Sequence, residues 1–177
     1  FRNTVDVSDS NAGTITIIDA PNTRNIVFRN TTVVDNFVTT TEGYDIFFQG
    51  DTTFTNAVTF QNSGTLDLGN GTNDDITFNG GVTVNTSGNV TIDGKIISSD
   101  DAISFGNVRF GQSTSITSAG GAISIGNITG FGSNRDITIT STGGTANTVT
   151  VGSIGGGNIN AVAITSGTLT TLNGDIT

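Results

Sequence analysis

Apolar residues alternate with threonine, serine or asparagine in short runs along the whole chain. Clear examples are Ile76-Thr77-Phe78, Val82-Thr83-Val84 and Val90-Thr91-Ile92. Successive side chains of a strand point to opposite faces, so each run predicts a strand with one buried face. Residues that favour helices are scarce, since Lys95 is the only lysine and Glu42 the only glutamate. We therefore expect an all-β chain.

A three-strand unit repeats in register. The strands of residues 76–92 have counterparts 24 residues earlier, at Phe54, Val58-Thr59-Phe60 and Leu66-Asp67-Leu68. A fixed period of about 20 to 50 residues is typical of solenoids and propellers, and three strands in about half the length of a propeller blade favour the solenoid. The predicted fold is a right-handed parallel β-helix with about three short strands per coil. The alternative is an antiparallel sandwich, because Asn79-Gly80 between two runs is also a strong hairpin signal.

The second half repeats at shorter and more variable spacing. Its first strand is recognised at four equivalent residues, Ile97, Ile116, Ile139 and Ile164. Companion strands begin at Ile103, Ile123 and Val149, and a third apolar position follows after a corner, at Val108, Ile128 and Ile154. Apolar side chains at positions i and i+2 are expected to stack inside, while the threonines and serines face solvent.

The strand repeat is regular in one part of the chain and less regular in the other. Residues 51–177 are expected to form the regular coils of one continuous solenoid, and residues 1–50 less regular N-terminal coils or a cap. The first part contains a group of aromatic residues, Phe28, Phe37, Phe47 and Phe48. They indicate either a broader end of the same core or a contact surface for a neighbour.

Composition restricts the function. The chain has no histidine and no cysteine, so the usual serine-triad, cysteine-protease and zinc chemistries are excluded. A net charge of −9 with scattered arginines argues against binding nucleic acid. No apolar run is long enough to predict a transmembrane segment. The chain starts at Phe1 without a methionine, so we expect a processed product or a fragment.

Carboxylates remain as the source of possible chemistry. The best local set for acid–base catalysis is Asp93, Lys95, Asp100 and Asp101, with Arg109 further along. Corner formation explains these aspartates more simply, so we predict no enzyme and no catalytic residues. The pairs Asp74-Asp75 and Asp100-Asp101 are calcium candidates, although the known calcium-loop patterns are absent. No other cofactor is expected.

The C-terminal part carries no charge between Asp136 and Asp175, although it is strongly strand-forming. Soluble proteins usually protect open sheet edges with charge, proline or a capping element. We therefore expect either a longer solenoid or head-to-tail self-association into a polymer, with Phe1, Ile176 and Thr177 at the contact.

Three segments, Asp101–Val108, Gly121–Ile128 and Asn173–Thr177, carry a family resemblance. They resemble the repeats of filamentous-haemagglutinin-like large exoproteins, over roughly residues 76 to 177. The resemblance implies a secreted bacterial cell-surface protein with a right-handed β-helix that serves in adhesion, a biofilm matrix or a sheath. The Asn-Pro-Asn-Gly-type secretion motif of that family is missing, because Pro21 stands in Ala20-Pro21-Asn22.

The sequence thus leads to two hypotheses. The first is a non-catalytic extracellular structural or adhesive β-solenoid, a shaft or filament subunit that contacts a glycan or another cell-surface ligand. The alternative is a carbohydrate-active β-helix enzyme, either a polysaccharide lyase or a hydrolase.

Overall fold

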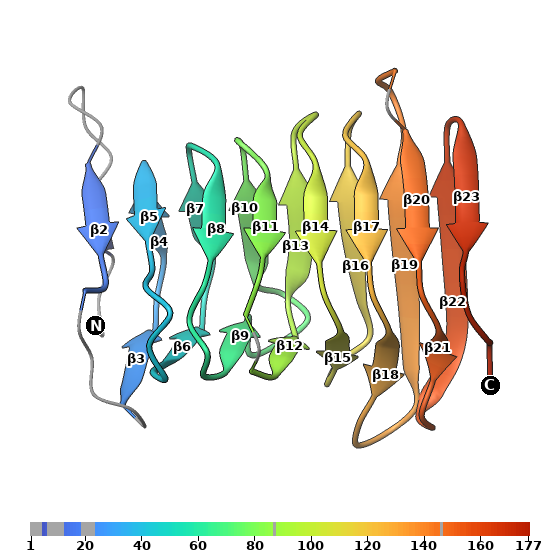
Figure 1. The fold of residues 1–177 in the computed structure, drawn as a ribbon, viewed down its shortest axis with the longest axis horizontal. Coiled ribbons are helices and arrows are strands. Elements are labelled where there is room, and N and C mark those ends of the chain that lie inside the picture. Colours follow the sequence, from blue (N-terminus) through green and yellow to red (C-terminus); the bar gives the residue numbers. More distant parts are fainter. Residues whose placement is uncertain (1–4, 7–12, 19–23, 87, 146) are drawn as a thin grey trace.

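The computed structural model describes residues 5–6, 13–18, 24–86, 88–145 and 147–177. These residues form 23 strands and no helix. The strands lie in three sheets that run along the molecule, which we name A, B and C in the order in which the chain enters them (Figure 1).

The strands of each sheet follow one another in chain order. Sheet A consists of β1 (Val5–Asp6), β4 (Thr32–Val34), β7 (Thr52–Phe54), β10 (Asp75–Phe78), β13 (Lys95–Ser98), β16 (Thr114–Ser118), β19 (Arg135–Ser141) and β22 (Ile159–Ser166). Sheet B consists of β2 (Thr14–Thr16), β5 (Asn36–Val38), β8 (Val58–Phe60), β11 (Val82–Val84), β14 (Ile103–Phe105), β17 (Ile123–Ile125), β20 (Thr148–Val151) and β23 (Leu169–Leu172). Sheet C consists of β3 (Asn25–Phe28), β6 (Asp45–Phe48), β9 (Leu66–Leu68), β12 (Val90–Ile92), β15 (Val108–Phe110), β18 (Ile128–Gly130) and β21 (Ile154–Gly155).

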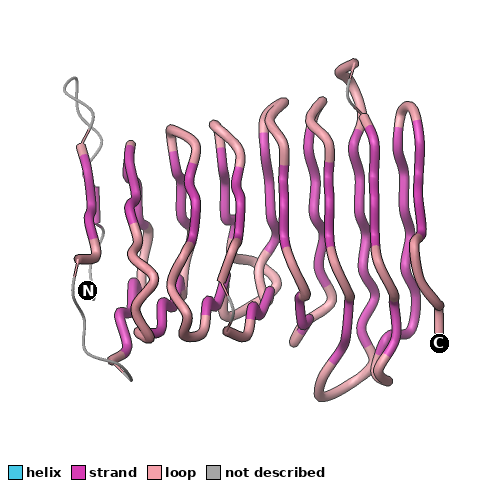
Figure 2. The backbone as a smooth tube through the Cα atoms, in the orientation of Figure 1, coloured by secondary structure: helices cyan, strands magenta, loops and turns pink. Residues whose placement is uncertain are grey.

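The chain winds through sheets A, B and C in turn, so every strand pairs in parallel with its counterpart one coil away. In Figure 1 the strands of sheet A rise behind those of sheet B, which descend in front while the chain advances toward its C-terminus. This winding is right-handed, the usual hand for parallel crossovers. The described strands make about seven turns, and loops occupy the corners between sheets (Figure 2). The predicted parallel β-helix is confirmed and the antiparallel sandwich is wrong.

The predicted register is confirmed where the 24-residue spacing was used. Phe78 pairs with Phe54, Val82 with Val58 and Val90 with Leu66, as that spacing requires.

One residue of the predicted register in the second half is wrong. Ile96, rather than Ile97, is the counterpart of Ile116. Ile96 is buried, whereas Ile97 lies on the outer face of β13. Because strand side chains alternate, a slip of one residue exchanges the two faces. The adjacent isoleucines obscured which of them points inward.

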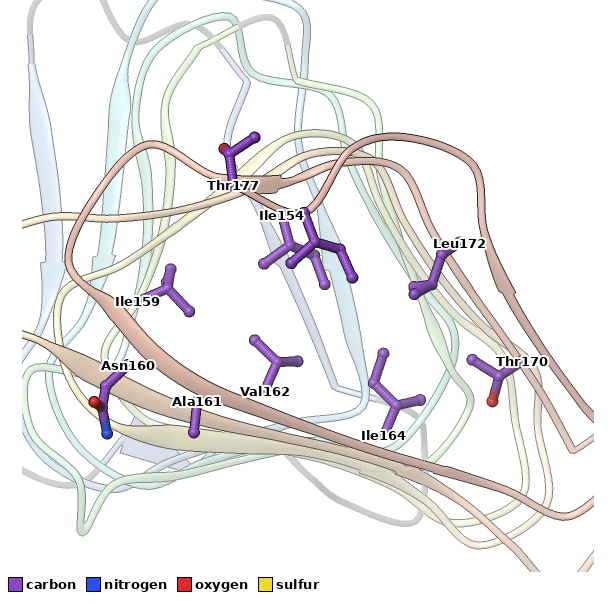
Figure 3. A pocket seen from close by; sticks show the side chains of 10 residues that line it. Ile154, Ile159, Asn160, Ala161, Val162, Ile164, Thr170, Leu172 and Thr177 are labelled. Atoms are coloured by element: carbon purple, nitrogen blue, oxygen red, sulfur yellow. The ribbon is translucent and has the colours of Figure 1, made fainter.

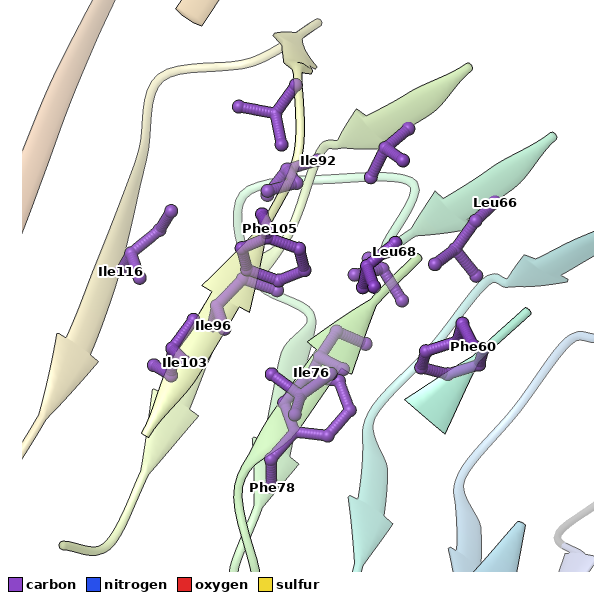
Figure 4. Close-up of a cluster of buried hydrophobic side chains, with 14 of the residues drawn as sticks. Phe60, Leu66, Leu68, Ile76, Phe78, Ile92, Ile96, Ile103, Phe105 and Ile116 are labelled. Carbon is purple, nitrogen blue, oxygen red and sulfur yellow. The ribbon is translucent and has the colours of Figure 1, made fainter. Parts of the chain in front are cut away.

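Inward side chains stack in columns from coil to coil and form one continuous apolar core (Figure 4). Phenylalanines dominate the N-terminal half of this core. The rings of Phe54 and Phe78 are stacked with centroids 5.0 Å apart, and those of Phe28 and Phe48 with centroids 4.9 Å apart. Parallel pairing places equivalent residues ~4.8 Å apart, which suits ring stacking along the axis.

The end of the sheet A strands departs from the expectation that serines face solvent. Ser98, Ser118 and Ser141 are paired in one inward column and are buried. Their hydroxyls donate to backbone carbonyls at the corner, as Ser118 does to Asp101 (3.2 Å) and Ser141 to Gly121 (2.7 Å). The same column contains Phe54 and Phe78 in earlier coils. Serine therefore replaces an apolar residue where the corner backbone needs a partner.

The described part of residues 1–50 contributes β1 to β6 to the same three sheets. Phe28, Phe37 and Phe48 are buried in the core, and Phe47 is half-buried on the outer face of β6. Three of the four rings thus belong to a phenylalanine-rich interior, as the first interpretation of this group expects.

Candidate functional site

Within the described residues, no further coil lies over the coil of β22 and β23. An open hollow of about 500 Å³ lies there, bordered by β22, β23 and the residues after them (Figure 3). Apolar side chains point into it from all three sheets, chiefly Ile154, Val162, Ile164 and Leu172. Ile176 also lines it. We call this surface the end face.

The end face is a section through the core columns. Val162 and Ile164 continue the column of Ile137 and Ile139, and Leu172 continues that of Val151. Whereas Ile137, Ile139 and Val151 are buried, Leu172 is 42% exposed and Ile176 is 65% exposed. These residues are apolar, as core residues are. In the described part of the chain, however, no further coil covers them.

The strand edges of the end face are open as well. β22 pairs with β19 and β23 pairs with β20, and each is the last strand of its sheet among the described residues. In sheet C, Ile176 makes an isolated parallel bridge to Ile154. Unpaired N–H and C=O groups of this kind are templates for another strand.

Two of the three residues that the sequence predicts at a self-association contact are described in the structure. Ile176 and Thr177 both lie on the end face, where Thr177 donates its backbone N–H to the Ile154 carbonyl (2.9 Å). Phe1 lies outside the described residues. The charge-free segment is evident in the sequence, whereas the apolar lining formed by Val162, Ile164 and Leu172 is evident only in the structure.

A second cluster lies on the outer side of sheet C, where two carboxyl groups interact across adjacent coils. Burial, and after it the charge of Asp93, raises the pKa of Asp67 to about 7. The pKa of Asp93 is also raised by burial, against the lowering effects of the Gly111 backbone and of Arg135. The Oδ1 atoms of both aspartates are buried without a hydrogen-bond partner among the described residues. A neutral carboxyl group is therefore favoured at this position.

Two arginines contact Phe131, and one of them acts on this carboxyl pair. The Arg109 guanidinium lies over the ring of Phe131, 4.7 Å from its centroid. Arg135 donates from Nη2 to the Phe131 carbonyl oxygen (3.2 Å) and influences the ionisation of Asp93.

The catalytic set considered from the sequence does not assemble in one place. Lys95 forms an ion pair with Asp75 in sheet A, with 3.0 Å between Nζ and Oδ1. Asp100 and Asp101 follow the end of β13, whereas Asp93 precedes its start. Asp67 was not among the residues predicted from the sequence. It lies between Leu66 and Leu68, at the outward position that Thr91 occupies in the next coil. An aspartate where the next coil has a threonine was the feature of the sequence that could have identified this residue.

The calcium candidates are also separated. Asp74 accepts the Asn70 backbone N–H through Oδ2 (2.7 Å), and Asp75 is engaged by Lys95 at the start of β10. Asp100 and Asp101 lie beyond the other end of sheet A. Within the described residues, no three acidic, histidine or cysteine side chains are grouped closely enough to hold a metal ion.

Comparisons with known proteins give no relative: no family model, curated protein or solved structure matches the chain. The described residues include no helix long and apolar enough to cross a membrane.

Proposed function

We propose that this chain is a non-catalytic structural element of an extracellular rod, extended along its axis by coils that stack on the end face. The observation that carries the proposal is the uncovered apolar section of the core, bordered by unpaired parallel strand edges. Covering it removes apolar surface from water and completes backbone hydrogen bonds in the same step.

The best-fitting occupant is a coil with the same three-sheet cross-section. β22 and β1 are the two edges of sheet A, and β23 and β2 are the two edges of sheet B. A second copy placed head to tail would therefore continue sheets A and B in parallel. Such a contact joins different surfaces of the two copies, does not close, and propagates into a filament.

Sedimentation of the chain over a range of concentrations tests this role. The wild type is expected to associate, and electron micrographs should show uniform rods. The double substitution Leu172→Asp and Ile176→Asp places charge on exposed side chains of the end face. We expect it to weaken association at least tenfold without lowering the melting temperature, because buried unpaired charges oppose stacking.

Val38→Asp is the matched control, because Val38 is 45% exposed on the lateral side of β5. It should leave association unchanged. A wild type that stays monomeric at high concentration, or a control that dissociates as readily as the double variant, would contradict the proposed stacking.

The extracellular, cell-surface location has a separate basis. It is supported by the resemblance of residues 76–177 to filamentous-haemagglutinin-like repeats. Localisation of the native protein by surface labelling of intact cells tests it independently of stacking.

A carbohydrate-active enzyme is the second candidate, and the carboxyl pair Asp67 and Asp93 favours it. Glycoside hydrolysis uses two carboxyl groups, one of them an acid whose pKa is raised toward neutrality. Turnover of polysaccharide that is lost in both Asp67→Asn and Asp93→Asn would favour the enzyme. Lack of turnover across acidic and neutral polysaccharides would favour the rod.

A further inference from the structure

A polar groove lies on the outer side of sheet C and its corner with sheet B. It has a volume of about 370 Å³ and spans several coils, with Asn89, Asn107, Arg109, Asn127 and Thr129 among its lining residues. We call it the Arg109 groove. It is separate from the end face and contains neither Asp67 nor Asp93.

Arg109 is an exposed cation without a carboxylate partner. It points outward from β15 between the buried residues Val108 and Phe110. Among the described residues, one ion pair is formed, between Lys95 and Asp75. No carboxylate oxygen of these residues therefore lies within 4.0 Å of a guanidinium nitrogen of Arg109. The Phe131 ring, 4.7 Å from the guanidinium carbon, supports one face of the guanidinium. This contact restricts its orientation and leaves its N–H groups available.

The asparagines beside Arg109 add donors. Asn107 accepts the Asn127 backbone N–H through Oδ1 (2.9 Å), and Asn127 accepts the Ser153 N–H through Oδ1 (3.1 Å). These bonds use the amide oxygens. The two Nδ2 amino groups donate to no residue in the described part of the chain. The groove therefore combines one cation with amide donors on successive coils.

Among the described residues, Asp93 forms no ion pair with Arg109. Arg109 pairs in register with Thr91, and Asp93 lies two residues beyond Thr91. Arg135 acts on Asp93 and opposes the rise in its pKa. On a chain with a net charge of −9, Arg109 places a positive charge in a donor-lined groove.

We infer that the Arg109 groove binds the carboxylate of an acidic glycan, a uronic-acid polymer lying along the solenoid axis. The guanidinium matches a carboxylate with two parallel N–H donors. The Nδ2 groups of Asn107 and Asn127 supply donors to sugar oxygens, one per coil, at a spacing of ~4.8 Å. This site goes beyond the proposed structural role and does not depend on stacking.

The test measures binding of oligogalacturonate and oligoglucuronate to the isolated chain by NMR titration. Both are compared with their carboxyl-reduced, neutral forms. We expect at least one acidic form to bind, at least tenfold more tightly than its neutral form, and more weakly as salt is raised. Arg109→Leu should weaken that binding at least tenfold. Arg109→Lys should cause an intermediate loss, because it retains the charge without the planar fork.

Arg29→Leu is the matched control for the loss of one positive charge. Arg29 is exposed at a different corner, where its Nη1 donates to Gln49 Oε1 (3.0 Å). It should bind the acidic glycan as the wild type does. Absence of binding to both acidic glycans, equal binding of the neutral forms, or equal losses in Arg29→Leu and Arg109→Leu would each overturn the inference. Unchanged circular dichroism spectra and melting temperatures confirm that the variants are folded.

Discussion

Asp67 shows how a single side chain makes the stability of the solenoid depend on pH. Its ordinary pKa of 3.8 is raised to about 7, by burial first and by Asp93 second. Between about pH 4 and 7 the folded chain therefore holds a proton that the unfolded chain has lost. The stabilisation from the neutral carboxyl is complete below about pH 4 and is lost as the pH rises through 7.

Asp67→Asn is expected to remove this dependence, because the amide has nearly the same shape and does not ionise. At about pH 8 the variant should be more stable than the wild type by about 1 kcal/mol, after allowance for the screening of a partly exposed group. That difference corresponds to roughly 2–4 °C in melting temperature for a chain of this size. At about pH 4 the two proteins should melt together. Thermal unfolding followed by circular dichroism at both pH values measures the difference.

Asp100→Asn removes the same charge from an exposed corner and serves as the control. A stabilisation of Asp67→Asn that is equal at both pH values would show that ionisation of Asp67 is not its cause.

The residue scale is also where sequence reasoning fails most. The adjacent pair Ile96 and Ile97 satisfies either strand register, so alternation alone cannot decide which side chain is inside. The raised pKa of Asp67 depends on burial and on Asp93, which comes near only through coil stacking. The local sequence pattern therefore gives neither the inward residue of this pair nor the pKa of Asp67.

At the scale of elements, the serine column joins three sheet A strands to the corner that follows them. Ser118 accepts the Gly121 backbone N–H (2.8 Å) and donates to the Asp101 carbonyl (3.2 Å). It therefore connects two successive corners. Because the site is buried, water cannot replace these bonds without rearrangement.

Ser118→Ala is expected to lower the free energy of unfolding by about 1–2 kcal/mol, since it leaves a buried N–H without its acceptor. Urea denaturation should show a lower midpoint with an unchanged slope. Ser124→Ala is the control, because Ser124 is exposed at the centre of β17 and should change stability by less than about 0.5 kcal/mol. Similar losses in the two variants would argue that strand propensity, and not the corner bonds, is the cause.

Strands are the elements that the sequence predicts best. The spacing of Phe54, Val58 and Leu66 relative to the next coil identifies three strands and their parallel partners correctly. The reason is that each strand has an apolar alternation of its own and a counterpart at a fixed distance. The serine column escapes this reasoning, because a polar residue at an inward position looks like an outward one.

At the scale of the whole molecule, each coil contacts mainly the coils before and after it. Sheets A, B and C each contain strands in chain order, so none of the described strands pairs outside this order. Stability is then approximately a sum of terms from coils and from their interfaces. The end face follows from the same organisation, because interrupting a column at any coil exposes a similar apolar section.

Removal of one whole coil tests this organisation. Deletion of residues 96–115 joins Lys95 to Ile116, the residue that pairs with Ile96. Ile76 would then face Ile116 and Val82 would face Ile123, with every inward residue still inside. We expect a folded solenoid of unchanged circular dichroism, shorter by ~4.8 Å in small-angle scattering and less stable by the interfaces of one coil. Deletion of residues 96–105 alone removes parts of two sheets and should unfold the chain. If both deletions unfold it equally, the coils are not interchangeable units, and an axial rod built by adding coils loses its physical basis.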